Sequence, residues 1–430
     1  MSDGYADHAK RLRRTGLVPD PWLAGEPRFS ETPIVLSEDE HDALCTAAEA
    51  VTAAVDAALA VLATRPDEAE QFLSLTPVQR LMWQASRPLW HGYARADVFR
   101  TTAGGLAVCE INADTPTGQP EAIACGRLAA EDHPGLRDPN AGLEARFCAM
   151  LRGALRAGVD PEWLAPETSG DARPTAGIVY ATEFTEDLSV IQLMQLWLER
   201  MGLRTVLGSP WNVGRDGAGR PTLLGQPCVL FLRHYKTDWW SERTPVWFDG
   251  EPYEDARPFA AQLEVLLRAA LERRAVTINP FGAVVAQNKR LFAWMWERMD
   301  LLPPAAAEAA RRYVPETIRL DALHPEQLMA ERADWVLKSD YGCEGQEVFV
   351  GRSCTPEAWA ETLALAVPER WVAQRFFEAR TEPDGRTLNY GPYTIAGRAA
   401  GLFVRSEEGP TDTSAQSVPV LVAPRGPGTG

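Results

Sequence analysis

The chain has 430 residues, 45% of them hydrophobic and 24% charged, which is typical of a globular protein with roughly two or three structural units. Its formal net charge of −16 disfavours nucleic acid as a partner, because binding to a phosphate backbone depends on basic residues. The 7 cysteines include no CxxC pair, which argues for a reducing compartment and against a disulfide framework or a structural zinc site. No apolar signal segment follows the N-terminus, so we expect a soluble, cytoplasmic protein.

Residues 1–93 are predicted to form an N-terminal helical region. Ser37-Glu38-Asp39-Glu40 has the pattern of a capping box and predicts an Ala-rich helix that continues to about residue 64. A second helix is predicted over 77–90. The most apolar stretch, 42–63, carries Glu49 and Asp56, so we expect no membrane span.

A β-hairpin opens the next region, 94–165. Its strands are predicted at 94–101 and 106–114, with the turn at Gly104-Gly105, and helices follow near 119–131 and 141–157. Residues 175–250 then read as a small α/β unit of the strand–helix–strand kind. Its predicted elements are strands at 176–182, 203–208 and 228–235, a helix at 187–201 and a hairpin over 208–227.

The last region, 257–423, is predicted to hold the nucleotide-binding core, followed by a disordered tail at 424–430. Its helices are predicted at 257–273, 287–299 and 356–366. Its strands are predicted at 335–340, 347–352, 371–379, 390–397 and 399–406. We therefore expect an α+β protein in which a mixed sheet from this region lies beside the 94–114 hairpin.

Polar side chains alternate along both strands of the hairpin. Arg95 and Asp97 are two residues apart and share one face of their strand, as Glu110 and Asn112 do on the next. Carboxylate and amide oxygens suit a hard cation such as Mg²⁺, and Arg95 would offer a forked donor to a phosphate. The alternative is a polar face exposed to solvent, which the apolar neighbours Cys109 and Ile111 disfavour.

Lysine is rare in this chain, since only four of the 43 basic residues are lysines. Lys338 ends a predicted strand and precedes a loop with Gly342 and Gly345, where backbone N–H groups can approach phosphates. Lys289 opens an amphipathic helix. Each lysine is a candidate phosphate ligand. An ordinary β-hairpin explains the 335–352 segment equally well.

Two further candidates lie near the C-terminus. Gln374 is in a buried strand of the type that contacts adenine, although a plain core strand fits as well. Arg405, at the end of the last long strand, could meet developing negative charge, and taken alone it also reads as an exposed arginine.

Together these segments resemble the synthetase domain of glutathionylspermidine synthase and its relatives, of ATP-grasp type. The resemblance spans roughly residues 80–420 in the family's order, and its most specific part is the NADTPT string at 112–117. The other matching segments are Arg95/Asp97, Glu110-Ile111, Tyr235-Lys236 with Trp239 and Trp240, Asn288-Lys289, Leu337-Lys338 with Gly342 and Gly345, Gln374, and Leu402–Arg405.

The resemblance implies an ATP-grasp-like fold with an inserted pre-ATP-grasp-like α/β unit, and ATP and Mg²⁺ as cofactors. By that resemblance Asp97, Glu110 and Asn112 would be metal ligands, and Arg95 and Arg405 would lie near the transferred phosphoryl group and the acyl phosphate. The nucleotide contacts would be Lys289, Lys338, Gly342, Gly345 and Gln374. The implied activity is that of an ATP-dependent carboxylate–amine ligase, with a small-molecule or peptide carboxylate and an amine as substrates.

Two departures from the family pattern keep other functions open. Cys343 stands where the family usually has an arginine, and the segment after Arg405 matches loosely. One alternative is a non-catalytic ATP-grasp-like protein that binds a peptide or an amine. Another is a carboxylate kinase that performs no ligation. Neither substrate identity nor an oligomeric state is predicted.

Overall fold

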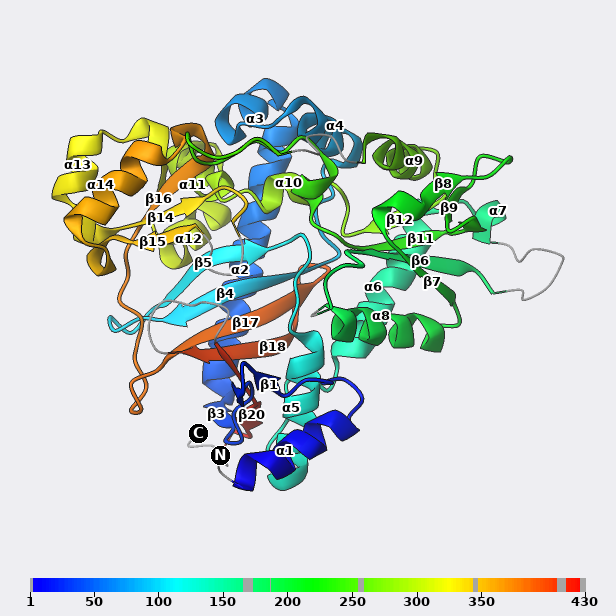
Figure 1. Ribbon diagram of the computed structural model, residues 1–430, viewed down its shortest axis with the longest axis horizontal. Coiled ribbons are helices and arrows are strands. Elements are labelled where there is room, and N and C mark those ends of the chain that lie inside the picture. The colour runs from blue at the N-terminus through cyan, green and yellow to red at the C-terminus, as the bar shows by residue number, and fades with distance from the viewer. Residues whose placement is uncertain are drawn as a thin grey trace.

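A long helix, α2 (Glu38–Ala63), runs through the middle of the protein, which we describe from a computed structural model (Figure 1). The structure describes residues 3–164, 173–185, 187–253, 259–342, 347–407 and 415–425. The predicted capping box starts α2: Ser37 Oγ accepts from the Glu40 N–H at 3.2 Å, and the Glu40 carboxylate accepts from the Ser37 N–H at 2.8 Å. Among the described helices α2 alone has the length and apolar content of a membrane span, and half of its apolar window is buried inside the fold.

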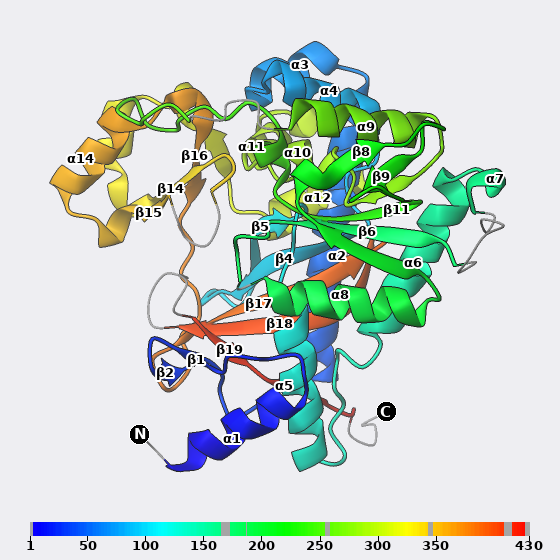
Figure 2. The ribbon, with the colours of Figure 1, turned by 45° about the vertical axis from the view of Figure 1, so that its right-hand side comes forward.

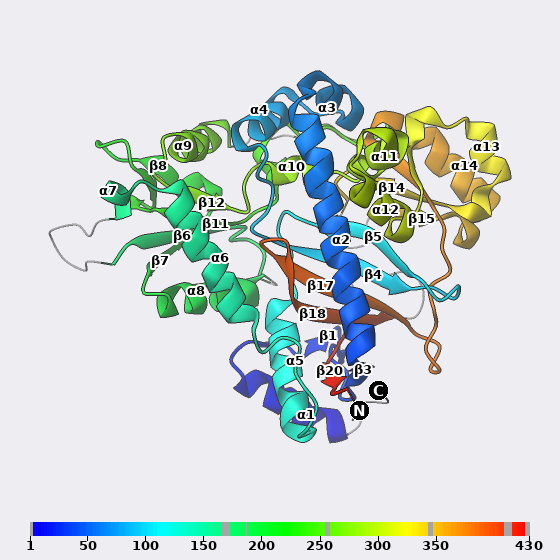
Figure 3. The same ribbon diagram turned by 180° about the vertical axis from the view of Figure 1, so that it is seen from behind.

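A five-stranded antiparallel sheet packs against α2, which crosses one face of the sheet and lies in front of it in Figure 3. The predicted hairpin forms one edge of this sheet and pairs with the last long strands of the chain. Thr52 of α2 meets Thr394 of the sheet, with their hydroxyl oxygens 3.4 Å apart. In spatial order the strands are β19 (Gln416–Val418), β18 (Arg398–Glu407), β17 (Thr387–Ile395), β4 (Tyr93–Arg100) and β5 (Leu106–Asn112).

A second antiparallel sheet of four strands carries Lys338 and Gln374. Its buried side is filled by Trp335, Trp359 and Trp371, each fully buried. The strands of the last region are thus divided between two antiparallel sheets. In spatial order the second sheet is β13 (Thr317–Arg319), β16 (Trp371–Arg375), β14 (Trp335–Ser339) and β15 (Val348–Val350), with α13 (Pro325–Ala330) and α14 (Pro356–Leu365) beside it (Figure 1).

The predicted α/β unit is present as a four-stranded parallel sheet at the right of Figure 1. Its order is β12 (Val276–Ile278), β11 (Leu230–His234), β6 (Thr175–Tyr180) and β7 (Arg204–Gly208). The helices around it are α6 (Leu143–Gly158), α7 (Pro161–Leu164), α8 (Leu188–Arg200) and α9 (Ala260–Leu271). A small sheet of β8 (Val213–Arg215), β9 (Pro221–Leu223) and β10 (Gln226–Pro227) replaces the predicted hairpin between two of its strands.

The remaining elements connect these sheets, and α1 and α5 lie together below the five-stranded sheet (Figure 2). The short strand β3 (Ile34–Ser37) pairs in parallel with β20 (Val420–Ala423), near the other end of the chain. The others are α1 (Asp3–Arg14), β1 (Trp22–Leu23), β2 (Glu26–Pro27), α3 (Pro66–Leu73), α4 (Pro77–Ser86), α5 (Gln119–Asp132), α10 (Ala283–Ala286), α11 (Arg290–Glu297) and α12 (Pro304–Tyr313).

Candidate functional site

Asp97 is the centre of a polar row that crosses the five-stranded sheet. Its Oδ1 atom accepts hydrogen bonds from Arg95 Nε and Asn112 Nδ2, both at 3.1 Å. Its Oδ2 atom accepts from Asn389 Nδ2 at 3.2 Å and from Arg405 Nη2 at 3.0 Å. Residues from β4, β5, β17 and β18 therefore converge on one carboxylate, and three of these four donors, Arg95, Asn112 and Arg405, were singled out from the sequence.

The charges in this row balance inside the protein. Burial alone would raise the pKa of Asp97, but Arg95 and Arg405 outweigh it, and the pKa is lowered from its ordinary value. The pKa of Arg95 is correspondingly raised, because Asp97 outweighs the effect of burial. Gly391 makes room for the arginine, since a Cβ atom there would lie 2.8 Å from Arg95 Cδ. Asp97 is thus a carboxylate and Arg95 a cation.

Glu110 lies directly opposite Asp97 in the β4–β5 pairing and faces Lys289. Lys289 Nζ is 3.4 Å from Glu110 Oε2 and donates to the Gly342 carbonyl at 2.6 Å. Lys289 immediately precedes α11, and its own N–H donates to the carbonyl of Asp340, at the end of β14. The start of α11, the first glycine of the 339–347 loop and Glu110 are therefore adjacent.

A β-bulge joins the two antiparallel sheets at the site. The register between β4 and β5 shifts after Asp97, so that Cys109 is an extra residue on β5. The Cys109 carbonyl accepts from Lys338 Nζ and from Gln374 Nε2, both at 3.5 Å. We expected Cys109 to be buried; it is half-buried, and burial raises the pKa of its thiol to about 11.

Lys338 and Gln374 form a buried pair on neighbouring strands. Lys338 Nζ donates to Gln374 Oε1 at 2.8 Å, while Gln374 Nε2 donates to Thr317 Oγ1 at 3.0 Å. Both ends of the Gln374 amide are thereby engaged within the protein. Gln374 thus contacts Lys338 and Thr317, and its expected contact with adenine stays a prediction.

The described residues fit the magnesium and phosphate ligands implied by the sequence. Asp97, Glu110, Asn112 and Asn389 offer carboxylate and amide oxygens from three strands, which is the donor chemistry of Mg²⁺. Lys289 and Lys338 lie beside this row and offer point charges for phosphate oxygens. Both Asp97 oxygens already accept two hydrogen bonds each, so a direct metal bond would replace at least one of these donors. Gly345 and Cys343 lie outside the described residues.

Asp114 of the NADTPT string serves a different purpose from its neighbours. It is buried, pairs with Arg233 Nη1 at 2.5 Å and accepts the Thr237 N–H at 2.6 Å. Asn279 adds to this junction, because its amide bonds to the backbone of Tyr93 and Ala113. These contacts hold the α/β unit against the hairpin. No sequence motif indicated the Asp114–Arg233 pair or Asn389.

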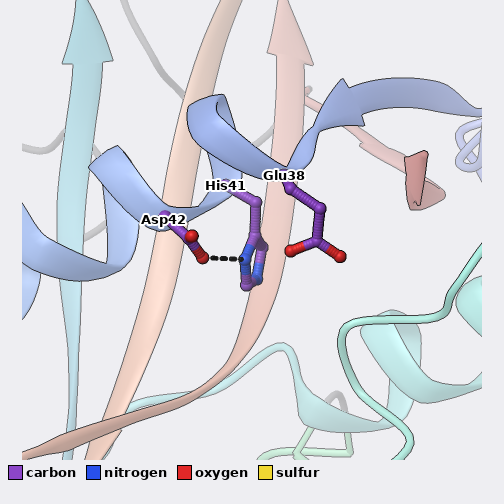
Figure 4. A group of neighbouring side chains, drawn as sticks. All are labelled: Glu38, His41 and Asp42. Atoms are coloured by element: carbon purple, nitrogen blue, oxygen red, sulfur yellow. Dashed lines mark ion pairs between the residues drawn. The ribbon is translucent and has the colours of Figure 1, made fainter. Parts of the chain in front are cut away.

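Two other features lie away from this row. Glu38, His41 and Asp42 form a possible ligand group on the first turns of α2, with ligand atoms within 4.8 Å of one another (Figure 4). Arg137 pairs with Glu38 and Arg425 with Asp42, so these carboxylates already have cationic partners. A cavity of about 630 Å³ lies among α5, α6 and α8, and no predicted site residue lines it.

Comparison with known proteins gives a family match over part of the chain and similar solved structures. A family model described as Glutathionylspermidine synthase preATP-grasp matches residues 232–423, and no curated protein sequence matches the chain. A glutathione synthetase-like effector from Globodera pallida, solved in its apo form, is similar with a TM-score of 0.58 and 10% identity over 96% of this chain and 95% of that one. A gamma-glutamylcysteine synthetase-like protein from Methylobacillus flagellatus KT gives a TM-score of 0.44 and 14% identity over 85% of this chain and 86% of that one.

The family match includes Lys289, Lys338, Gln374 and Arg405, and the hairpin with Asp97 lies before it. At 10% identity the likeness to the effector establishes a shared fold. The protein therefore has an α+β, glutathione synthetase-like fold, and its 232–423 segment matches the model of the glutathionylspermidine synthase family that the sequence motifs indicated.

Proposed function

We propose that the protein is an ATP-dependent carboxylate–amine ligase that forms an amide bond through an acyl phosphate. The observation that carries this proposal is the convergence of Asp97, Glu110, Asn112 and two arginines on one sheet, beside the buried lysines Lys289 and Lys338. Oxygen ligands, phosphate-binding lysines and arginines together are what transfer of a phosphoryl group to a carboxylate requires.

The chemistry takes two steps. A carboxylate oxygen of the first substrate attacks the γ-phosphorus of ATP, and ADP leaves. The amine of the second substrate then attacks the acyl carbon, inorganic phosphate leaves, and the amine loses a proton. No general base is assigned among the residues of the row, and orientation of the reactants is the contribution we expect from the protein.

The residues of the row have distinct roles in this scheme. Lys289 and Lys338 hold phosphate oxygens of the nucleotide. Arg95 and Arg405 flank Asp97 and would stabilise negative charge on the transferring phosphoryl group and on the acyl phosphate. Asp97, Glu110 and Asn112 would hold Mg²⁺, which when bound neutralises the charge of the phosphate oxygens.

A hydroxylamine trap tests the proposal even while the amine substrate is unidentified. The protein is incubated with ATP, Mg²⁺ and a panel of amino acids and thiol peptides that includes glutathione, and hydroxamate and ADP are measured. A ligase gives hydroxamate with hydroxylamine, and an amide with a matching amine; spermidine belongs in the amine panel because the matched family's description names it. Glu110→Ala should abolish both signals and leave the fold intact.

The alternative functions give different results in the same assay. A carboxylate kinase would form ADP and hydroxamate, but no amine would yield an amide. A binding protein without activity would bind the nucleotide, carboxylate or amine and release no ADP with any combination. Hydroxamate formation that persists in Glu110→Ala would show that the reaction proceeds elsewhere.

A further inference from the structure

We propose that Asn389 is a fourth oxygen donor of the cation site, an inference that rests on the proposed function and extends its ligand set to a third strand. Asn389 lies on β17 opposite Arg405 and is only 3% exposed. Its Nδ2 atom donates to Asp97 Oδ2 at 3.2 Å. No motif identified in the sequence includes it.

The orientation of the Asn389 amide follows from the chemistry of its partner. An ionised carboxylate only accepts hydrogen bonds, and Asp97 lies between the guanidinium groups of Arg95 and Arg405, its ion-pair partners. The nitrogen must therefore face Asp97, and Oδ1 is directed elsewhere. That oxygen is buried and has no hydrogen-bond partner among the described residues.

A buried amide oxygen without a hydrogen-bond partner destabilises a protein, because it has lost its water and gained nothing in return. Arg405 does not satisfy it, because the guanidinium of Arg405 is directed to Asp97 Oδ2. Asn112, on the other side of Asp97, is half-buried and open to solvent, so its oxygen can be hydrated. The unpartnered oxygen of Asn389 thus marks a position at which an incoming group completes the row.

A divalent cation matches that position best. Asp97 is hydrogen-bonded to Asn112 and Asn389 and lies opposite Glu110, so four oxygen-bearing side chains, two of them anionic, are neighbours from which a cation would take its hard ligands. A substrate N–H group could also donate to Asn389, but it would not use the neighbouring carboxylates as ligands. A bound cation would therefore account for the oxygen atoms of the whole row and not for that of Asn389 alone.

The experiment measures Mn²⁺ binding by electron paramagnetic resonance and by calorimetry, with and without a non-hydrolysable ATP analogue. Asn389→Leu keeps the volume and removes the oxygen, so Mn²⁺ affinity should fall by about ten-fold or more. Asn389→Asp restores an oxygen and adds charge, so Mn²⁺ should bind at least as tightly as to the wild type. In that variant Mn²⁺ should also raise the melting temperature by more than in the wild type, because it relieves repulsion from Asp97.

The control is Thr387→Val, two residues earlier on the same face of β17, which should bind Mn²⁺ like the wild type. Near-ultraviolet circular dichroism checks the fold, and Asn389→Ala serves as the loss variant if the leucine variant does not fold. Wild-type affinity in the loss variant would overturn the inference and leave the proposed function standing. Failure of the wild type to bind Mn²⁺ with nucleotide would overturn both.

Discussion

Removal of the Asp97 carboxylate should lower the free energy of unfolding of the ligand-free protein. This is the opposite of what is often seen for site carboxylates, whose removal can stabilise a protein. In Asp97→Ala the guanidinium of Arg95, whose side chain is 9% exposed, loses its counter-charge and keeps the Thr117 carbonyl, at 3.0 Å, and the ring of Phe403. Breaking a buried ion pair in this way costs about 3–5 kcal/mol. Arg405 is 21% exposed and can turn to solvent, which favours the lower end of that range.

The corresponding change in melting temperature follows from the size of the chain. For 430 residues the entropy of unfolding is about 0.9 kcal/mol per kelvin, so a loss of about 3 kcal/mol lowers the melting temperature by about 3 °C. The measurement is thermal and urea unfolding without nucleotide or divalent metal. Urea should show a lower midpoint with an unchanged slope.

Glu110→Ala is the matched control for this experiment. Glu110 is more exposed, with 21% of its side chain accessible, and Lys289 retains the Gly342 carbonyl when the glutamate is removed. Its effect on stability should be less than half that of Asp97→Ala. Equal stability of Asp97→Ala and the wild type, or a larger loss for Glu110→Ala, would refute the charge balance described for the row.

Three other predictions concern the nucleotide, the chemistry and pH. Lys338→Met should weaken binding of a non-hydrolysable ATP analogue about ten-fold, or 1.4 kcal/mol by calorimetry, whereas Lys10→Met, on the surface, should not. In Arg95→Lys the single ammonium group cannot contact both Asp97 and the Thr117 carbonyl, so kcat should fall more than the affinity for ATP. Near-normal kcat with weakened ATP binding would instead show that Arg95 holds the phosphate equally in bound ATP and in the transition state. Burial lowers the pKa of His91 in the folded protein to about 4. As the pH falls, His91 is therefore protonated in the unfolded chain before it is protonated in the folded protein, and the free energy of unfolding should drop by about 3 kcal/mol between pH 6.5 and 4. In His91→Phe that part of the fall should disappear from urea unfolding measured across this range.

The hairpin half of the site could be predicted from the sequence, because local rules determine it. A spacing of two along a strand puts Arg95 and Asp97 on one face, and a short turn brings Glu110 and Asn112 beside them. Lys289 and Lys338 were conspicuous because lysine is rare here. The capping box at Ser37 likewise depends on residues within one turn.

The other half could not be predicted, because it depends on which strands pair. Nothing near Asn389 indicates that β17 lies next to β4, and a lone asparagine in an apolar strand carries little signal. The bulge at Cys109, which directs a backbone carbonyl to Lys338 and Gln374, also depends on pairing. The short helices α3 and α13 and the strand β12 were missed because they span too few residues for a clear period.

The pairing of β4 with β17 also sets the order in which the protein can be completed during synthesis. Asp97 lies 292 residues before Asn389 and 308 before Arg405. Asp97 is therefore synthesised long before two of the four residues that donate hydrogen bonds to its carboxylate. A nascent chain that ends near residue 380 already contains both lysines and the hairpin, yet β4 still has an unpaired edge. Such an edge is prone to wrong pairing, and contacts so distant in sequence form slowly. We therefore expect C-terminal truncations to yield aggregated chains and not a smaller folded protein.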